Sequence, residues 1–321
     1  MSWRARYDEA AARLGSKVEA RWIVEEAASG TWPLLLDEAV SERAQRYFDQ
    51  MVARRATGEP LQYVLGRWGF RQLDLLVNQQ VLIPRPETEQ VVEVALRELA
   101  SLEGAGGAAG PVGGGGAAGP VGGGGAVGPV GGGGAVGPVG GGAAGPVVVD
   151  LGTGSGAIAL SLAAEGTPGA VWATDVCPEA LAIARANLVG LGGSRAAKVR
   201  LVEGSWWDAL PASLRGQVSL VISNPPYVTT AEMASLPAVV SDWEPALALD
   251  GGPMGLDAIA VIVSEAPGWL ARPGVLVVEL APDQAAEAAA LARRAGFDDV
   301  GVVPDLTGRD RALVARLRAV S

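Results

Sequence analysis

The second half of the chain alternates short apolar runs with longer stretches of helical length, and this alternation constrains the fold strongly. Runs that predict strands lie at residues 147–150, 170–174, 198–202, 218–222 and 275–280, and stretches that predict helices lie at 157–164, 178–191, 256–270 and 284–295. Strands that alternate with helices form a largely parallel sheet that is covered on both faces. Two further runs, 300–303 and 312–317, predict strands that close the sheet. We therefore expect an α/β domain at residues 147–321.

The first part of the chain predicts a separate helical unit. Between residues 2 and 57, apolar residues recur at helical spacing among charges of both signs, with breaks at 30–33 and 58–60. This pattern predicts a small N-terminal domain of three or four helices, residues 1–60. Residues 61–102 then predict short strands at 61–65, 68–70, 73–77 and 81–83 around a hairpin, followed by a connecting helix that opens near Thr88 and ends near Leu102.

The segment 103–146 has low complexity and consists almost entirely of glycine, alanine, proline and valine. Its glycine at every third position is superficially similar to collagen. However, proline occurs only once per nine residues in the repeat, and many triplets are all glycine, which resists ordering. We predict a flexible linker or surface insert without a function of its own.

Composition excludes several kinds of chemistry. The 321 residues include no histidine, which removes histidine triads, histidine general bases and the usual histidine metal ligands, so we expect no metal site. A net charge of −10 argues against a broad duplex-DNA surface, which needs clustered lysine and arginine. A reaction catalysed by this chain must rely on positioning, carboxylates or hydrogen bonds.

The same composition bears on location. Cys177 is the single cysteine, so no internal disulfide can form. No stretch resembles a signal peptide, and none approaches the roughly 18 apolar residues of a membrane span. We expect a cytoplasmic protein without membrane contact.

The apolar run that begins at residue 219 ends in Asn224-Pro225-Pro226-Tyr227. Because proline has no N–H for a sheet ladder, the chain leaves the sheet at Asn224, at the edge where open α/β sheets bind ligands. The Asn224 side-chain oxygen and the Pro225 carbonyl are two acceptors that can each take one N–H of a planar NH2 group, which aims the nitrogen lone pair at an activated methyl. Tyr227 offers a flat apolar wall. For Asn-Pro alone, an Asx-type turn is the simpler interpretation, but Pro-Pro-Tyr after an apolar strand favours a binding loop.

A glycine-rich turn follows the first predicted strand of the sheet, with the sequence Asp150-Leu151-Gly152-Thr153-Gly154-Ser155-Gly156. Glycines allow close backbone approach to a ligand, but their spacing departs from the dinucleotide fingerprint. The preceding acid would repel a pyrophosphate and suits a cationic cofactor. Asp175 ends the next strand, where an acid typically bonds a ribose diol, although a helix N-cap before Pro178 is an alternative. Together these features point to S-adenosylmethionine.

Two aromatic residues, Trp206 and Trp207, follow the third strand of this domain. An aromatic ring at this place can cover an adenine, and burial in the core is an equally good interpretation of such a pair. Cys177 lies close to Asp175 in the sequence. We interpret it as a small, half-buried residue and not as a nucleophile, because no histidine exists to activate it.

Together, these motifs resemble the PrmC/HemK family, the release-factor glutamine methyltransferases, over nearly the whole chain outside the glycine-rich insert. The segments that carry the resemblance are Glu59 to Tyr63 with Leu65-Gly66, Ile83 to Glu89, Asp150 to Leu160, Asp175, Ser223 to Tyr227, Glu244 to Leu247, and Asp305 to Arg311. The Asn-Pro-Pro-Tyr loop alone is shared with adenine and guanine amino-methyltransferases. Its combination with the segment from Pro84 to Glu89 is much more specific.

The resemblance implies a Rossmann-like class I S-adenosylmethionine-dependent methyltransferase domain. It implies methyl transfer to the side-chain amide of the glutamine in the Gly-Gly-Gln motif of peptide chain release factors. The residues that it assigns to the cofactor are Gly152, Thr153, Gly154, Ser155, Gly156, Asp175, Trp206 and Asn224. Those that it assigns to the substrate are Asn224, Pro225, Pro226 and Tyr227, with Asn224, Pro225 and Tyr227 catalytic. The helical domain would help to dock the release factor, and we expect a monomer that does not contact nucleic acid directly.

Three positions depart from the family pattern. Ser205 replaces the usual acid before the tryptophan, Met254 replaces an acid in a Gly-Gly-x-Asp-Gly-Leu run, and Ala281 replaces a glycine. Other functions are compatible with the sequence: methylation of a glutamine in a ribosomal protein, methylation of a nucleic-acid amino group, and a catalytically silent methyltransferase fold that serves as a scaffold.

Overall fold

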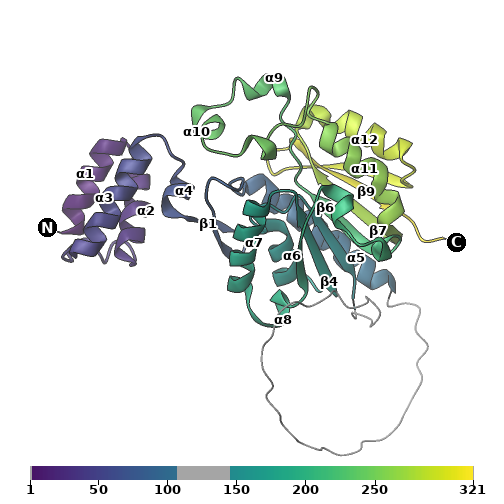
Figure 1. The fold of residues 1–321 in the computed structure, drawn as a ribbon, viewed down its shortest axis with the longest axis horizontal. Helices are drawn as coiled ribbons and strands as arrows, with labels where there is room; N and C mark the ends of the chain where they lie inside the picture. The colour runs from purple at the N-terminus through teal and green to yellow at the C-terminus, as the bar shows by residue number, and fades with distance from the viewer. Residues whose placement is uncertain (1, 107–144, 321) are drawn as a thin grey trace, which may run out of the picture.

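The computed structural model describes residues 2–106 and 145–320. Three helices form the N-terminal unit, as the spacing of apolar residues predicts: α1 (Trp3–Leu14), α2 (Lys17–Ala28) and α3 (Glu42–Ala56) (Figure 1). Ser16 and Ser41 cap the second and third helices, because their side-chain oxygens accept backbone N–H groups of the first turn. Ile23, Phe48 and Met51 are buried among the three helices.

The predicted strand at residues 61–65 is wrong, because these residues form the short helix α4 (Leu61–Leu65). A five-residue apolar run fits either structure, so its periodicity cannot decide between them. A distant contact favours the helix: the Arg54 guanidinium donates to the Tyr63 and Val64 carbonyls at the end of α4. The same guanidinium pairs with Glu59. The predicted strand at 81–83 is also wrong: in the described structure this segment is a bend followed by irregular chain and belongs to no strand.

A hairpin of β1 (Arg67–Phe70) and β2 (Leu73–Leu76) follows, as predicted, and α5 (Pro86–Gly106) comes next. This helix extends past the predicted end near Leu102. Of the predicted glycine-rich insert, residues 107–144 lie outside the described residues.

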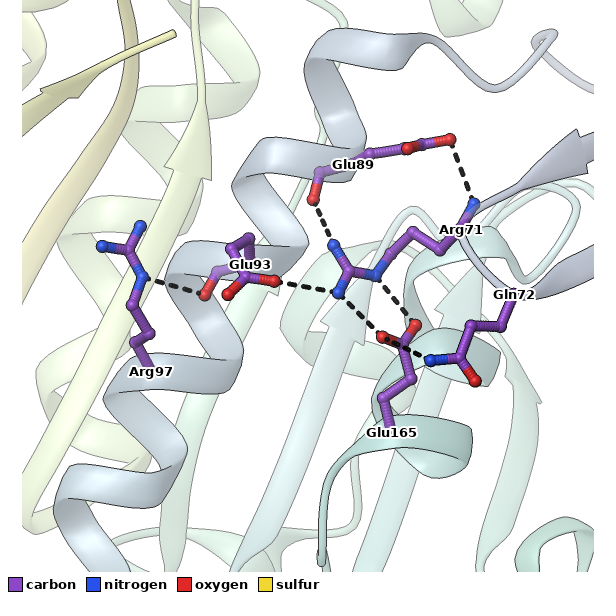
Figure 2. A network of polar contacts seen from close by, with 6 residues as sticks. All are labelled: Arg71, Gln72, Glu89, Glu93, Arg97 and Glu165. Carbon is purple, nitrogen blue, oxygen red and sulfur yellow. Dashed lines mark hydrogen bonds and ion pairs between the residues drawn. The ribbon is translucent and has the colours of Figure 1, made fainter. Parts of the chain in front are cut away.

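Arg71, at the turn of the hairpin, ties the hairpin to two helices (Figure 2). Its guanidinium makes two 2.8 Å hydrogen bonds to the Glu165 carboxylate at the end of α6 (Ala157–Glu165) and one of 2.9 Å to Glu93 on α5. It also donates to the Glu89 carbonyl at 2.9 Å. The bond to Glu165 is the largest cause of a raised Arg71 pKa, so the arginine stays charged. This network fixes the first turns of α5 against the sheet domain.

The main sheet has seven strands in the order β5-β4-β3-β6-β7-β9-β8. Their bounds are β3 (Val147–Leu151), β4 (Ala170–Asp175), β5 (Val199–Glu203), β6 (Val218–Ser223), β7 (Leu270–Glu279), β8 (Asp299–Pro304) and β9 (Asp310–Leu317). The first five pair in parallel, and β9 pairs antiparallel with both β7 and β8. The sheet therefore confirms the predicted α/β fold with two closing strands, in a mixed arrangement typical of class I methyltransferases.

Helices cover both faces of this sheet (Figure 1). The helices on one face are α5, α6 (Ala157–Glu165) and α7 (Pro178–Leu191), and those on the other are α11 (Asp257–Trp269) and α12 (Ala285–Arg294). Alternate residues of β3 feed the two cores, since Val148 packs with the first set and Val149 with the second. Short helices at α8 (Gly193–Ala196), α9 (Thr230–Met233) and α10 (Ala238–Ser241) were not predicted.

Candidate functional site

Three neighbouring strands, β3, β4 and β6, end at the same edge of the sheet. Leu151 pairs with Thr174 of β4 and with Ser223 of β6, so the residues that follow each strand emerge side by side. The Ser223 hydroxyl donates a 2.6 Å hydrogen bond to the Leu151 carbonyl and fixes the two strand ends together. The glycine turn after β3 and the Asn-Pro-Pro-Tyr loop after β6 therefore start from one place.

The glycine turn needs its glycines. Gly152, Gly154 and Gly156 have φ values of 75°, 55° and 85°, a backbone region that residues with a side chain rarely adopt. Asp175 holds the turn, because its Oδ2 accepts the Gly154 N–H at 2.8 Å and its Oδ1 accepts the Cys177 N–H at 2.9 Å. Each carboxylate oxygen retains lone-pair capacity, so Asp175 can accept further hydrogen bonds from a ligand.

Asp150 has a different position from the one that the sequence suggests. It does not face a ligand, because it is fully buried beneath the glycine turn. Its Oδ2 accepts the Thr153 hydroxyl at 2.6 Å and the Ala159 N–H at 3.1 Å. Burial raises the pKa of Asp150 to about 7, and the bond from Thr153 counteracts this only in part. Asp150 thus shapes the turn and the start of α6.

This burial predicts a pH effect on stability. The folded chain binds the Asp150 proton more tightly than the unfolded chain does, so the free energy of unfolding falls as pH rises from about 4 to about 7. The isosteric, uncharged variant Asp150→Asn should lack this pH-dependent change in the free energy of unfolding, which is on the order of a few kcal/mol in the wild type. Chemical denaturation at several pH values would measure it, with the exposed Asp8→Asn as control. Equal pH slopes for Asp150→Asn and wild type would contradict the prediction.

A cavity of about 670 Å³ opens at this edge of the sheet. Of the residues that the sequence assigns to a site, those that line it are Gly152, Thr153, Gly154, Ser155, Asp175, Trp206, Asn224 and Pro226. Gly156, Pro225 and Tyr227 are not among the lining residues. The cavity thus brings together the glycine turn, the acid of β4 and the asparagine of β6.

The two adjacent tryptophans have different environments. Trp206 lines the cavity, and its ring lies over Gly152, where an added Cβ would be 3.5 Å from Cζ3. Its φ of 43° is unusual for a residue with a side chain and indicates a backbone held by its surroundings. Trp207 is buried in the core and stacks on Trp269 at 5.6 Å. Trp206 therefore has a place that suits a ring covering a ligand, and Trp207 is a core residue.

Asn224 presents one end of its carboxamide to α5. Its Nδ2 donates a 3.2 Å hydrogen bond to the Thr88 hydroxyl oxygen. Within residues 2–106 and 145–320, no donor reaches Asn224 Oδ1, and the side chain lines the cavity. The oxygen is therefore free to accept a hydrogen bond from a ligand.

Tyr227 is held away from the cavity. Its hydroxyl donates to Glu279 Oε1 at 3.2 Å, and its backbone carbonyl accepts Gln284 Nε2 at 2.7 Å. Gly251 lies so close to the loop that an added Cβ would be 2.7 Å from the Pro226 carbonyl oxygen. The loop is thus fixed from two sides by backbone and side-chain contacts.

Sequence reasoning missed several lining residues, among them Thr88 and the segment from Gln80 to Leu82. The available signal was the motif from Pro84 to Glu89, which carries part of the family resemblance and predicts a helix start, but to which the sequence assigns no site residue. The structure shows a second reason for it: Arg85 pairs with the buried Glu244, which also accepts the Ile83 N–H. This ion pair joins two segments that carry the family resemblance.

The three departures from the family pattern have different environments. Ser205 lines the cavity, and Met254 is exposed. Ala281 has a φ of −75°, which an alanine adopts without strain.

The described part of the chain lacks two further features. None of its helices is both long and apolar enough to cross a membrane. In the same residues, no group of three or more cysteine, aspartate or glutamate side chains is arranged to hold a metal ion.

Two family models match the chain: the PrmC N-terminal domain over residues 7–66 and the Methyltransferase small domain over residues 143–248. A Moorella thermoacetica protein named release factor glutamine methyltransferase is 37% identical, and the match covers 99% of each chain. A Bordetella pertussis protein of the same name is 36% identical over 92% of this chain and 93% of its own length.

A solved structure is similar in fold alone. The hMettl16 catalytic domain, in complex with MAT2A 3′UTR hairpin 1, matches with a TM-score of 0.53 and 16% identity, over 84% of this chain and 81% of that chain. The sequence relatives decide the family. Because they align with nearly the whole chain at more than a third identity, this chain belongs to the PrmC/HemK family of release factor glutamine methyltransferases.

Proposed function

We propose that this chain transfers a methyl group from S-adenosylmethionine to the side-chain amide nitrogen of the glutamine in the Gly-Gly-Gln motif of peptide chain release factors. Its relatives carry the corresponding name. The observation that carries the proposal is the place of Asn224, which lines the cavity beside the glycine turn with its Nδ2 bonded to Thr88 and its oxygen free. That arrangement suits a carboxamide substrate.

The residues present fit the cofactor. The cavity volume lies in the range of small-molecule sites. The glycine turn allows close approach of its backbone, Asp175 has lone pairs for a ribose diol, and Trp206 offers a flat ring above Gly152. When bound, S-adenosylmethionine supplies an electrophilic methyl group on a sulfonium.

The chain contributes positioning and hydrogen bonds. The substrate amide nitrogen is a weak nucleophile, because its lone pair is delocalised into the carbonyl. Asn224 Oδ1 would accept one of its N–H groups, and the Pro225 carbonyl, which follows directly in the chain although Pro225 itself does not line the cavity, would accept the other. The lone pair would then point away from both acceptors. These dipoles also stabilise positive charge that develops on nitrogen. The alkylated nitrogen is acidic and loses its proton to solvent, so no strong base is required.

The N-terminal helices α1 to α3 stand beside the sheet domain on the side of the hairpin (Figure 1). We assign them to docking of the release factor. Their match to the PrmC N-terminal domain supports this assignment.

Mass spectrometry tests the proposed substrate. Purified release factor is incubated with the protein and S-adenosylmethionine, and a mass gain of one methyl group is expected on the Gly-Gly-Gln peptide. A release factor with that glutamine replaced by alanine is the control and should gain nothing. A methylated ribosomal protein or nucleic acid, with unmodified release factor, would redirect the proposal. Absence of S-adenosylmethionine binding in calorimetry would favour a silent scaffold.

A further inference from the structure

Gln284 lies in the connection between β7 and α12, and its side chain is buried. Its carboxamide oxygen accepts the Ala281 N–H at 3.1 Å. Its carboxamide nitrogen, Nε2, donates to the Tyr227 carbonyl at 2.7 Å and to the Gly255 carbonyl at 3.2 Å. The Met254 carbonyl is a third, longer acceptor at 3.4 Å. Both ends of this carboxamide therefore have backbone partners.

These surroundings allow only one orientation of the Gln284 carboxamide. Backbone carbonyls can only accept hydrogen bonds, and a backbone N–H can only donate one. In the reversed orientation, the side-chain oxygen would face the three carbonyls and the nitrogen would face the Ala281 N–H, so the polar groups would lose their partners. Gln284 thus joins two segments of the chain, one at Tyr227 and the other at Gly255, through a single oriented group.

The same two segments also pack backbone against backbone. Gly255 has a φ of 67°, and a Cβ added to it would clash with the Tyr227 carbonyl oxygen and with Gln284 Nε2. Earlier in the segment, the Gly251 N–H donates to the Val228 carbonyl at 2.8 Å. The close approach at Gly255 is therefore what brings its carbonyl and that of Tyr227 within reach of one side chain.

The Asn224 loop is fixed at both ends. At its start, the Ser223 hydroxyl donates to the Leu151 carbonyl at 2.6 Å. The two prolines that follow Asn224 have no N–H to donate, and their rings restrict φ. At the far end of the loop, the Tyr227 carbonyl is held by Gln284. Because the loop between these two ends is stiff, a shift of the Tyr227 carbonyl would also move Asn224.

We propose that Gln284 is a positioning residue that clamps the Asn-Pro-Pro-Tyr loop to the segment at Gly255 and so holds Asn224 Oδ1 in place for the substrate amide. This role rests on the proposed function. Gln284, Gly255 and Tyr227 are not among the residues that line the cavity, so the clamp acts through Asn224 and not by contact with the substrate. A misplacement of about 1 Å in a reacting geometry costs about 10²-fold in rate, so a contact outside the cavity can control catalysis.

Gln284→Met tests the clamp, because methionine fills a similar space but cannot hold the Tyr227 and Gly255 carbonyls. The kcat for release-factor methylation should fall roughly 10-fold to 100-fold. The KM for release factor and the affinity for S-adenosylmethionine should change little. Rates are expressed per molecule that binds S-adenosylmethionine, so a loss of folded protein alone does not lower kcat. A Gln284→Met protein with wild-type kcat would overturn the proposal, and so would a loss confined to KM or to cofactor affinity.

Gly255→Ala breaks the same contact from the other side, since its methyl group would push the Tyr227 carbonyl away from Gln284. We expect a similar loss of kcat, and a double variant that is little worse than the weaker single variant. Gly216→Ala is the matched control: its φ is 70°, and no atom of the described residues lies within 4 Å of an added Cβ. It carries comparable backbone strain without a clash and should keep wild-type kcat. Equal losses in the two alanine variants would overturn the proposal.

Backbone hydrogen exchange, followed by NMR, tests the clamp without catalysis. The Gly251 N–H, which donates to the Val228 carbonyl, should exchange slowly in the wild type and faster in Gln284→Met. The Gly152 N–H, which donates to the Thr174 carbonyl at 2.9 Å, should exchange equally in both. Unchanged exchange at Gly251 would overturn the clamp. So would fast exchange there in the wild type, even if Gln284→Met fails to fold. A wild type that methylates another molecule and not release factor would instead refute the proposed substrate.

Discussion

Replacing Asn224 with alanine is expected to lower the kcat for release-factor methylation by about 10²-fold to 10³-fold, the usual loss for one preorganised hydrogen-bonding group. The expectation follows from its free Oδ1 at the cavity and from the bond that fixes its Nδ2 to Thr88. Affinity for S-adenosylmethionine should change little, because the glycine turn and Asp175 are untouched. Initial rates at saturating substrates and calorimetric titration of the cofactor measure the two quantities.

The variant Asn224→Gln separates chemistry from placement. It keeps the carboxamide but extends the side chain by one methylene, so the oxygen no longer lies where the substrate requires it. We expect a loss close to that of Asn224→Ala, with an unchanged melting temperature in both. Near wild-type methylation by Asn224→Ala would refute the lone-pair mechanism.

Much of the fold could be predicted because its segments are strongly patterned. The predicted range of α7, residues 178–191, matches the observed helix, and four of the five parallel strands agree with the predicted runs to within one residue at each end. The fifth, β7, begins at Leu270, five residues before the predicted run at 275–280. Local pattern failed where distant contacts decide the structure. Residues 61–65 form a helix that Arg54 helps to end, and the segment 81–83 is held by Glu244, far along the chain, and not by a sheet partner.

Some residues of the candidate site could be placed from the sequence, and others could not. Residues that directly follow strands, such as Asp175 and Asn224, could be placed from the sequence, because the ends of parallel strands share one edge. Asp150 could not, since its burial depends on how α6 starts above it. Nor could Thr88, because its contact with Asn224 joins residues 136 positions apart. Such a contact needs the packing of α5 on the sheet, which no local pattern encodes.

Replacing Asp175 with alanine is expected to weaken binding of S-adenosylmethionine by about 100-fold. A charge-assisted hydrogen bond contributes about 1.5–3 kcal/mol, and tenfold in affinity corresponds to about 1.4 kcal/mol. The alanine variant loses the proposed acceptor for the ribose diol together with the bonds that hold Gly154 and Cys177. Calorimetric titration of the purified variant measures the change.

Glu203 provides the matched control, because it ends β5 directly beside Asp175 in the strand register but does not line the cavity. Removing an acid from this edge alters the local charge equally in both variants, so Glu203→Ala reports the purely electrostatic part. It should bind the cofactor with nearly wild-type affinity. Equal weakening in the two variants would mean that general charge attracts the sulfonium, and that Asp175 has no specific contact with the ribose. Asp175→Asn refines the comparison, since an amide keeps one acceptor and should recover part of the affinity.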